Sequence, residues 1–294
     1  MKRIVTILFA CALLLCGVAL AEETAETPAP VNTQVKHYLL LGQDGYDEEI
    51  SESARTDTVV LVSLDRKYNR VIMTSIMRDS QIETVRGNTT KVNLLFRANG
   101  LEGMTECIEK QLDIDIEGAV LVNFEHVKPV IDALGGVDIE ITEDEWIRIR
   151  KILQYKDPNM PKGPGMTHMT GRIALAYMRD RSSGMTGDFG RTERQRKVVS
   201  QLFDKCRNLS LMDLIGVYNQ VSEGMMMSLS AIDILAAIKD GYSLIVSDAD
   251  FVEHRIPDDG TFYYEYLNGS SSSLHVYWKK NRTILHDLLN NPPQ

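Results

Sequence analysis

The chain has little cysteine, and its few cysteines disfavour a metal site built on thiolates. Only 4 occur in 294 residues. None forms a Cys-x-x-Cys pair or lies beside a pair of histidines, which are the usual spacings of zinc ligands. Cys107 and Cys206 are the two that lie beyond the N-terminal segment. In an oxidising compartment they either pair or stay buried as free thiols.

Positive charge is also scarce. The chain has 32 lysines and arginines against 41 aspartates and glutamates, which gives a net charge of −9. This balance, together with the lack of a DNA-reading motif, argues against binding to nucleic acid. Gly135-Gly136 is not followed by Gly-Lys-Ser or Gly-Lys-Thr, so it indicates a turn and not a phosphate loop.

Against this acidic background, arginines are concentrated between residues 179 and 196. A guanidinium is planar, permanently charged and able to bind two phosphate oxygens at once, so the cluster predicts a specific anionic ligand. The alternative is a solvated face on which the arginines pair with Asp180, Asp188 and Glu193.

One long apolar run occupies residues 4–21 and follows the basic residues Lys2 and Arg3. This pattern predicts an export signal or a membrane anchor. Ala19-Leu20-Ala21 fits a cleavage site, but the run also reaches the lower limit for a membrane span. The positive-inside rule puts the rest of the chain outside. We therefore expect an exported protein at the outer face of the cytoplasmic membrane or in the cell wall.

Residues 22–36 are polar and contain proline, which predicts a linker ahead of one domain at 37–294. Within that domain, short β-branched runs alternate with segments of helical period. We expect an α/β fold with a central mixed sheet flanked by helices on both sides. The predicted strands are 38–41, 58–64, 71–76, 119–124 and 137–141, and the predicted helices are 101–112, 126–134, 192–206, 211–222 and 230–240. Residues 155–170 have no regular period and predict a loop.

Two places in this pattern suit a phosphate ligand. Arg78-Asp79 follows a predicted strand directly, at the strand end where open α/β sheets bind ligands. Arg191, Arg194 and Gln195 fall in the first turns of the helix predicted at 192–206, where unpaired N–H groups attract anions.

Seven short motifs follow one another along a motif core at residues 37–205. They are Leu39-Leu40-Leu41-Gly42-Gln43-Asp44, Arg55-Thr56-Asp57-Thr58, Ser75-Ile76-Met77-Arg78-Asp79, Lys91-Val92-Asn93, Asp132-Ala133-Leu134-Gly135-Gly136-Val137-Asp138, Ala174-Leu175-Ala176-Tyr177-Met178-Arg179-Asp180-Arg181 and Asp188-Phe189-Gly190-Arg191-Thr192-Glu193-Arg194-Gln195. Their order and spacing resemble those of the LytR-CpsA-Psr (LCP) family.

The resemblance implies a phosphotransferase of the bacterial cell envelope. Such enzymes move a glycopolymer, for example wall teichoic acid or capsule, from a polyprenyl-pyrophosphate carrier to peptidoglycan through a phosphodiester, with the help of Mg²⁺ or Mn²⁺. Its partners would be the lipid-linked glycan, the peptidoglycan acceptor and the membrane.

The resemblance also implies the site residues. The metal would be bound by Asp44 and Asp57. Asp79 and Asp188 are candidates for the carboxylate that accepts a proton, and Arg78 and Arg191 are expected to act in catalysis. The residues expected to hold the pyrophosphate are Arg55, Arg78, Arg179, Arg181, Arg191 and Gln195.

The chemistry is consistent with these residue types, because transfer at phosphorus needs its oxygens neutralised and its leaving group stabilised. Magnesium prefers hard oxygen ligands and keeps several waters, so two carboxylates and the substrate phosphates suffice. Two alternatives remain open: a hydrolase of the lipid-linked pyrophosphate, in which water replaces the acceptor, and a non-catalytic binding protein for lipid-linked precursors.

Three further features depart from the family's motifs or lie outside them. Met77 occupies a position where the family usually has proline. The segment between Asp44 and Asp57 is long and acidic. The C-terminal aromatic residues Tyr263, Tyr264, Tyr266, Tyr277 and Trp278 either stack on sugars or pack within strands.

Overall fold

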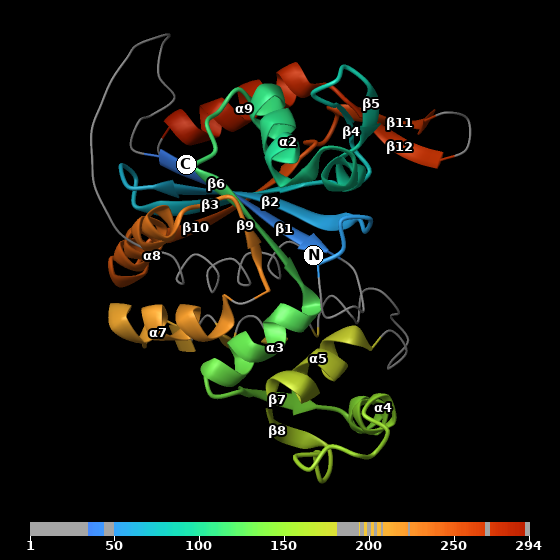
Figure 1. The fold of residues 1–294 in the computed structure, drawn as a ribbon, viewed down its shortest axis with the longest axis vertical. Helices are drawn as coiled ribbons and strands as arrows, with labels where there is room; N and C mark the ends of the chain where they lie inside the picture. Colours follow the sequence, from blue (N-terminus) through green and yellow to red (C-terminus); the bar gives the residue numbers. More distant parts are fainter. Residues whose placement is uncertain are drawn as a thin grey trace. The chain divides into compact units, whose positions relative to one another are not determined.

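The computed structural model describes residues 35–43, 50–180, 194, 197–198, 201–202, 205–206, 208–222, 224–267 and 271–291 (Figure 1). The described residues form two compact units. The sheet unit contains residues 35–123 and 225–291, and the inserted unit contains residues 124–224. The predicted signal or anchor and the linker lie almost wholly outside the described residues. None of the helices in the described ranges is long and apolar enough to span a membrane.

The sheet unit is built on six strands in the order β10-β3-β2-β1-β6-β9. Strand β1 runs parallel to β6, and β10 runs parallel to β3, whereas the other neighbours are antiparallel. The prediction of a central mixed sheet is therefore confirmed. The strands are β1 (Val35–Gln43), β2 (Thr56–Asp65), β3 (Arg70–Ile76), β6 (Gly118–Asn123), β9 (Met226–Met227) and β10 (Asp250–Ile256).

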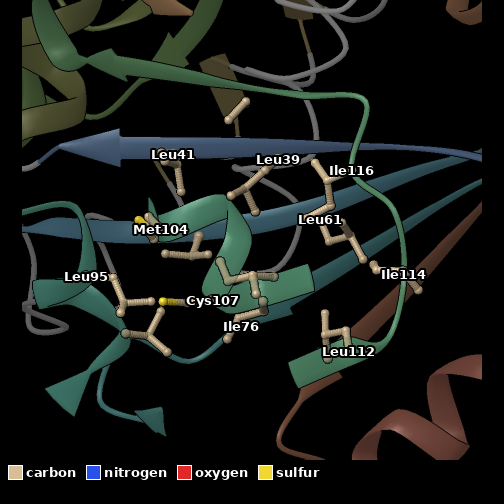
Figure 2. Packing of buried hydrophobic residues seen from close by; sticks show 14 of the residues in the cluster. Leu39, Leu41, Leu61, Ile76, Leu95, Met104, Cys107, Leu112, Ile114 and Ile116 are labelled. Atoms are coloured by element: carbon tan, nitrogen blue, oxygen red, sulfur yellow. The ribbon is translucent and has the colours of Figure 1, made fainter. Parts of the chain in front are cut away.

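Helices cover both faces of this sheet, as predicted (Figure 1). Helices α2 (Leu95–Leu112) and α9 (Trp278–Asn290) lie on one face, and α8 (Ala231–Val246) lies on the other. A 3₁₀ turn, η1 (Val92–Leu94), precedes α2. Strand residues Leu39, Leu41 and Leu61 pack against Met104 and Leu112 of α2 in a continuous apolar core (Figure 2). The central strands are buried on both faces, which explains their unbroken apolar runs in the sequence.

Two hairpins complete the sheet unit. One joins β4 (Gln81–Glu83) to β5 (Thr89–Lys91), and the other joins β11 (Phe262–Leu267) to β12 (Ser271–Val276). The amide of Leu274 in β12 donates to the carbonyl oxygen of Asp79 (2.9 Å). The second hairpin is therefore bonded directly to the segment that follows β3.

The inserted unit is mainly helical. Its elements are α3 (Phe124–Ala133), β7 (Val137–Ile141), α4 (Glu143–Ile152), β8 (Gly165–Met169), α5 (Gly171–Arg179) and α7 (Leu211–Val221). The described residues between 194 and 206 are also helical, with Val198 and Leu202 buried, as their spacing predicts.

The sequence prediction was incomplete at residues 137–170. The predicted strand at 137–141 exists, but it pairs with β8 in a separate two-stranded sheet. The segment 155–170 is not loop throughout, because its last residues form β8, whose buried Thr167 and Met169 alternate with exposed Met166 and His168. The glycines and prolines just before β8 masked this short alternation.

Cys107 and Cys206 are both buried, and neither is in a disulfide within the described part of the chain, so of the two alternatives the buried thiols are confirmed. Burial raises the pKa of the Cys107 thiol. A buried thiol that stays protonated is a small apolar core residue and a poor nucleophile.

We predict that His37 makes the stability of the sheet unit depend on pH. His37 lies in β1 with 3% of its surface exposed, and its Nδ1 lies 2.7 Å from the Ser63 hydroxyl. Burial, followed by the charge of His286, lowers the pKa of His37 from 6.5 to about 4. Above pH 6.5 both folded and unfolded states hold it neutral, and stability is complete. Below that, the unfolded state binds the proton first, so about 3 kcal/mol should be lost by pH 4.

Urea unfolding between pH 7.5 and pH 4 measures this loss. Other groups also titrate in this range, so the quantity of interest is the difference between the wild type and His37→Gln, which cannot take up the proton. An equal loss in the two proteins would contradict the prediction.

Candidate functional site

In the sheet unit, Asp57 lies between Arg78 and Asn93. Arg78 Nη1 donates to Asp57 Oδ2 (2.6 Å), and Asn93 Nδ2 donates to Asp57 Oδ1 (3.2 Å). The β2–β3 register explains the first contact. Val60 lies opposite Ser75 in this antiparallel pair, and continuing the register three residues outward sets position 57 opposite position 78. Two predicted site residues from separate motifs are thus in contact.

A tight turn holds Arg78 at the end of β3. The amide of Ser80 donates to the Met77 carbonyl oxygen (3.0 Å), and the amide of Asn93 donates to the Arg78 carbonyl oxygen (3.0 Å). The amide of Met77 donates to the Ile256 carbonyl oxygen of β10 (2.8 Å). A proline at position 77 has no N–H and cannot make this last bond. Met77 thus makes a hydrogen bond to the neighbouring strand that proline could not make. Proline, in turn, would have fixed the φ angle at this position.

The carboxylate of Asp79 is partly exposed and lies close to two cationic side chains. Lys91 Nζ lies 3.0 Å from its Oδ1, and Arg78 Nε lies 3.6 Å from its Oδ2. Its side chain keeps 41% of its surface exposed. Asp57, Arg78, Asp79, Lys91 and Asn93 thus form one cluster, which we call the Arg78 cluster. Arg55 is exposed and precedes β2 by one residue.

The donor set at Asp57 is compatible with a hard divalent cation. Each carboxylate oxygen of Asp57 accepts one hydrogen bond and keeps a second lone pair, and its side chain is 20% exposed. Carboxylate oxygens are the ligands that Mg²⁺ prefers. Asp44, the other predicted metal ligand, lies outside the described residues. Within residues 50–180 and the other described ranges, no three Asp, Glu, His or Cys side chains form a group that could hold a metal.

In the inserted unit, Arg179 ends helix α5 and pairs with Glu125 at the start of α3. Arg179 Nη1 lies 2.9 Å from Glu125 Oε1, and Lys128 contacts the other carboxylate oxygen. Burial opposes ionisation of Glu125, but the hydrogen bonds and charges of Lys128 and Arg179 outweigh it, and the pKa of Glu125 is lowered. The carboxylate therefore stays charged and orients Arg179 in the absence of a ligand.

A buried network lies next to Arg179 in the chain. Arg194 is 4% exposed, and its Nη2 donates to the Asp180 carbonyl oxygen (2.6 Å). Its Nη1 lies 3.5 Å from Glu145, which also caps helix α4, and Arg148 Nε lies 3.5 Å from the Asp180 carboxylate. Arg194 thus pairs with neighbouring carboxylates, as the alternative predicts, but in a buried network and not on a solvated face. The network joins the two ends of the segment between residues 180 and 194.

Five of the predicted site residues lie outside the described residues, namely Asp44, Arg181, Asp188, Arg191 and Gln195. The structure also reveals contacts that the sequence prediction missed. Asn93 belongs to a recognised motif, but its role as a hydrogen-bond donor to Asp57 follows only from the fold. Glu125 lies outside every motif, and no signal in the sequence pairs it with Arg179.

The comparisons with known proteins agree with this architecture. The LytR_cpsA_psr family model matches residues 19–283. The polyisoprenyl-teichoic acid–peptidoglycan teichoic acid transferase TagU of Bacillus licheniformis is 28% identical over 243 residues, which cover 81% of this chain and 76% of TagU. The structure of TagT bound to LIIa-WTA is 25% identical with a TM-score of 0.60, over 94% of this chain and 98% of TagT. The structure of YwtF (TagT) with bound octaprenyl pyrophosphate lipid shares the fold, with 24% identity, a TM-score of 0.57 and coverage of 90% and 92%.

Proposed function

This chain belongs to the LytR_cpsA_psr family, and we propose that it is an extracytoplasmic phosphotransferase. Its substrate would be a glycopolymer on a polyprenyl-pyrophosphate carrier, which it attaches to peptidoglycan through a phosphodiester. The TagU relative is named as a polyisoprenyl-teichoic acid–peptidoglycan teichoic acid transferase, which supports this reaction class. The observation that carries the proposal is the Arg78 cluster, in which an arginine and two carboxylates from separate motifs meet.

We assign the pyrophosphate to arginine side chains from the family's motifs, which are Arg55, Arg78, Arg179, Arg181 and Arg191, together with Gln195. Arg78 has a carboxylate partner on either side, so it is oriented before a ligand binds. Preorganised donors stabilise developing charge without rearranging during the reaction. A guanidinium fork suits two oxygens of one phosphate group better than a lysine ammonium does.

A divalent cation, Mg²⁺ or Mn²⁺, would be held by Asp57 and Asp44. When bound, such an ion neutralises charge on the phosphate oxygens. Asn93 and Arg78 fix the orientation of the Asp57 carboxylate from both sides. Oriented ligands bind a metal more tightly than freely rotating ones.

The transfer step exchanges one P–O bond for another. A hydroxyl oxygen of the peptidoglycan glycan attacks the phosphorus next to the glycopolymer, and the bond from that phosphorus to the bridging oxygen breaks. Polyprenyl phosphate leaves with the bridging oxygen, and the arginines neutralise its charge. The hydroxyl proton passes to a carboxylate, for which Asp79 and Asp188 are the candidates.

We also propose that the reaction takes place outside the cytoplasmic membrane. The basic start and apolar run at residues 2–21 support export, and the lipid tail of the donor requires proximity to the membrane. Retention or removal of that segment changes how the protein is held at the membrane, but not the chemistry of the site.

Mass spectrometry of a complete reaction tests the proposal. The purified protein is incubated with a short polyprenyl-pyrophosphoryl glycan, a peptidoglycan oligomer and Mg²⁺, beside a sample with excess EDTA. We expect a glycan-phosphate adduct on peptidoglycan that forms only with the metal. Release of polyprenyl phosphate with the same yield whether or not the acceptor is present would establish a hydrolase instead. A donor that co-purifies with the protein but stays intact would establish a binding protein.

A further inference from the structure

The β11–β12 hairpin presents aromatic rings on its surface, and the two faces of the hairpin differ. Tyr263 and Tyr277 are each 43% exposed and face His275. The Tyr263 and His275 rings stack with centroids 4.6 Å apart, and the Tyr277 centroid lies 6.0 Å from each of them. Tyr264 and Tyr266 alternate with Tyr263 along β11 and so project from the other face. We call Tyr263, His275, Tyr277 and the adjacent Glu265 the ring platform.

Polar groups border the ring platform and are held in place. Gln81 Nε2 donates to Glu265 Oε2 (3.0 Å) and lies 2.9 Å from the Ser273 hydroxyl, while His275 Nδ1 lies 3.3 Å from the same Glu265 oxygen. The Glu265 side chain keeps 45% of its surface exposed, so its carboxylate can also accept hydrogen bonds from a ligand. Ring faces beside fixed hydrogen-bonding groups match a sugar, which has apolar C–H faces and a rim of hydroxyls.

The charges on and around the ring platform determine whether it suits a charged or an uncharged glycan. Glu265 is the only charged side chain between residues 262 and 276, and the Lys280 ammonium lies over the Tyr277 ring at 5.3 Å from its centroid. The Glu265 carboxylate and the Lys280 ammonium at the border have opposite charges, so the platform and its border together carry no net charge. A polyanionic glycopolymer gains nothing from such a surface, whereas an uncharged N-acetylated glycan loses nothing.

The hairpin that carries the ring platform is bonded to the segment that follows Arg78. Leu274 donates its amide to the Asp79 carbonyl oxygen (2.9 Å), and Ser80 and Leu274 form a parallel bridge. Trp278 Nε1 donates to the Gln81 carbonyl oxygen (2.8 Å), which joins the start of α9 to the same segment. A glycan on the platform therefore lies beside the segment that carries Arg78 and Asp79.

We propose that the ring platform binds the uncharged glycan backbone of the peptidoglycan acceptor by stacking sugar rings on Tyr263 and Tyr277. The identity of this glycan as acceptor rests on the proposed function, but the surface chemistry does not. A sugar held here delivers its hydroxyl from the side of Asp79, the candidate proton acceptor.

The test measures binding of a soluble β-1,4-linked N-acetylglucosamine hexamer to the full chain by calorimetry. We expect Tyr263→Ala and Tyr277→Ala each to weaken association about five-fold. The matched controls are Tyr264→Ala and Tyr266→Ala, which remove more exposed rings from the opposite face of the same hairpin and should leave binding unchanged. Far-UV and near-UV circular dichroism establish that each variant is folded.

Three results would overturn the inference: no binding of the hexamer by the wild type at millimolar concentration, equal losses in the platform variants and the controls, or tighter binding of poly(glycerol phosphate) than of the hexamer. A transfer assay separates this inference from the proposed function. If transfer occurs, the platform variants should raise KM for the acceptor and leave KM for the lipid-linked donor unchanged. If no transfer occurs but hexamer binding depends on Tyr263 and Tyr277, the proposed function fails and the glycan surface stands.

Discussion

Replacing Arg70 with methionine should lower the free energy of unfolding by about 3–5 kcal/mol. Arg70 and Asp65 lie opposite each other at the closed end of the β2–β3 hairpin, and both are fully buried. Arg70 Nε donates to Asp65 Oδ2 (2.7 Å), and its Nη2 donates to the carbonyl oxygens of Leu288 (2.8 Å) and Leu289 (3.2 Å) near the end of α9. In the variant, the buried Asp65 carboxylate and the two helix carbonyl oxygens lose the hydrogen bonds that Arg70 donates to them.

Urea unfolding at pH 7.5 measures the loss. The matched control is Lys110→Met, which breaks the exposed ion pair between Lys110 and Glu83 (3.3 Å) and should cost less than about 1 kcal/mol. The double variant Asp65→Leu with Arg70→Met removes both charges, and we expect it to be more stable than the single Arg70 variant. A single variant as stable as the Lys110 control would show that the buried pair does not anchor α9.

Replacing Arg78 with alanine should reduce kcat/KM for glycopolymer transfer about 100- to 1000-fold. Ion pairs with Asp57 and Asp79 orient the Arg78 guanidinium before the ligand binds. The alanine variant therefore loses a hydrogen-bond donor that is already in position. Arg78→Lys should recover part of the loss, because the charge returns without the planar fork. The quantities are initial rates of adduct formation over a range of donor concentrations.

Arg86→Ala provides the control, since Arg86 is an exposed arginine in the turn between β4 and β5. Removing it changes the net charge of the protein by the same amount, away from the cluster. Equal losses in the two variants would mean that net charge, and not the position of Arg78, governs binding of the lipid-linked pyrophosphate. In that case the assignment of Arg78 would be wrong.

Much of the sheet unit could be predicted because its strands and helices have strong local patterns. The runs at 38–41, 58–64 and 71–76 are buried on both faces, so residues that face either side of the sheet contribute to the apolar signal. The C-terminal part gave no such signal. Strand β10 mixes polar and apolar residues over Asp250–Ile256 without a regular alternation, and the β11–β12 hairpin is rich in tyrosine and serine. Its place beside Asp79 depends on pairing between distant segments.

The candidate site, too, could be predicted only in part from the sequence. The types of residue in the Arg78 cluster are visible as motifs, and the contact between Asp57 and Arg78 follows once the β2–β3 register is known. Arg194 shows the limit of such reasoning. It stands in the same motif as Arg191, but burial against Asp180 and Glu145 makes it structural, and burial of a single arginine has no signature in one sequence.

The pairing of β6 with β9 has a consequence for how this protein tolerates change. The chain leaves the sheet after Asn123 and re-enters it at Met226, and the two strands at these points are antiparallel neighbours, with Leu121 opposite Met226. An excursion that begins and ends at adjacent strands behaves as a long hairpin loop, and loop closure depends only weakly on loop length. The register of the sheet is therefore insulated from insertions and deletions between residues 124 and 224. The lengths of the connections between the motifs of that segment can therefore vary while the sheet that holds Arg78 keeps its geometry.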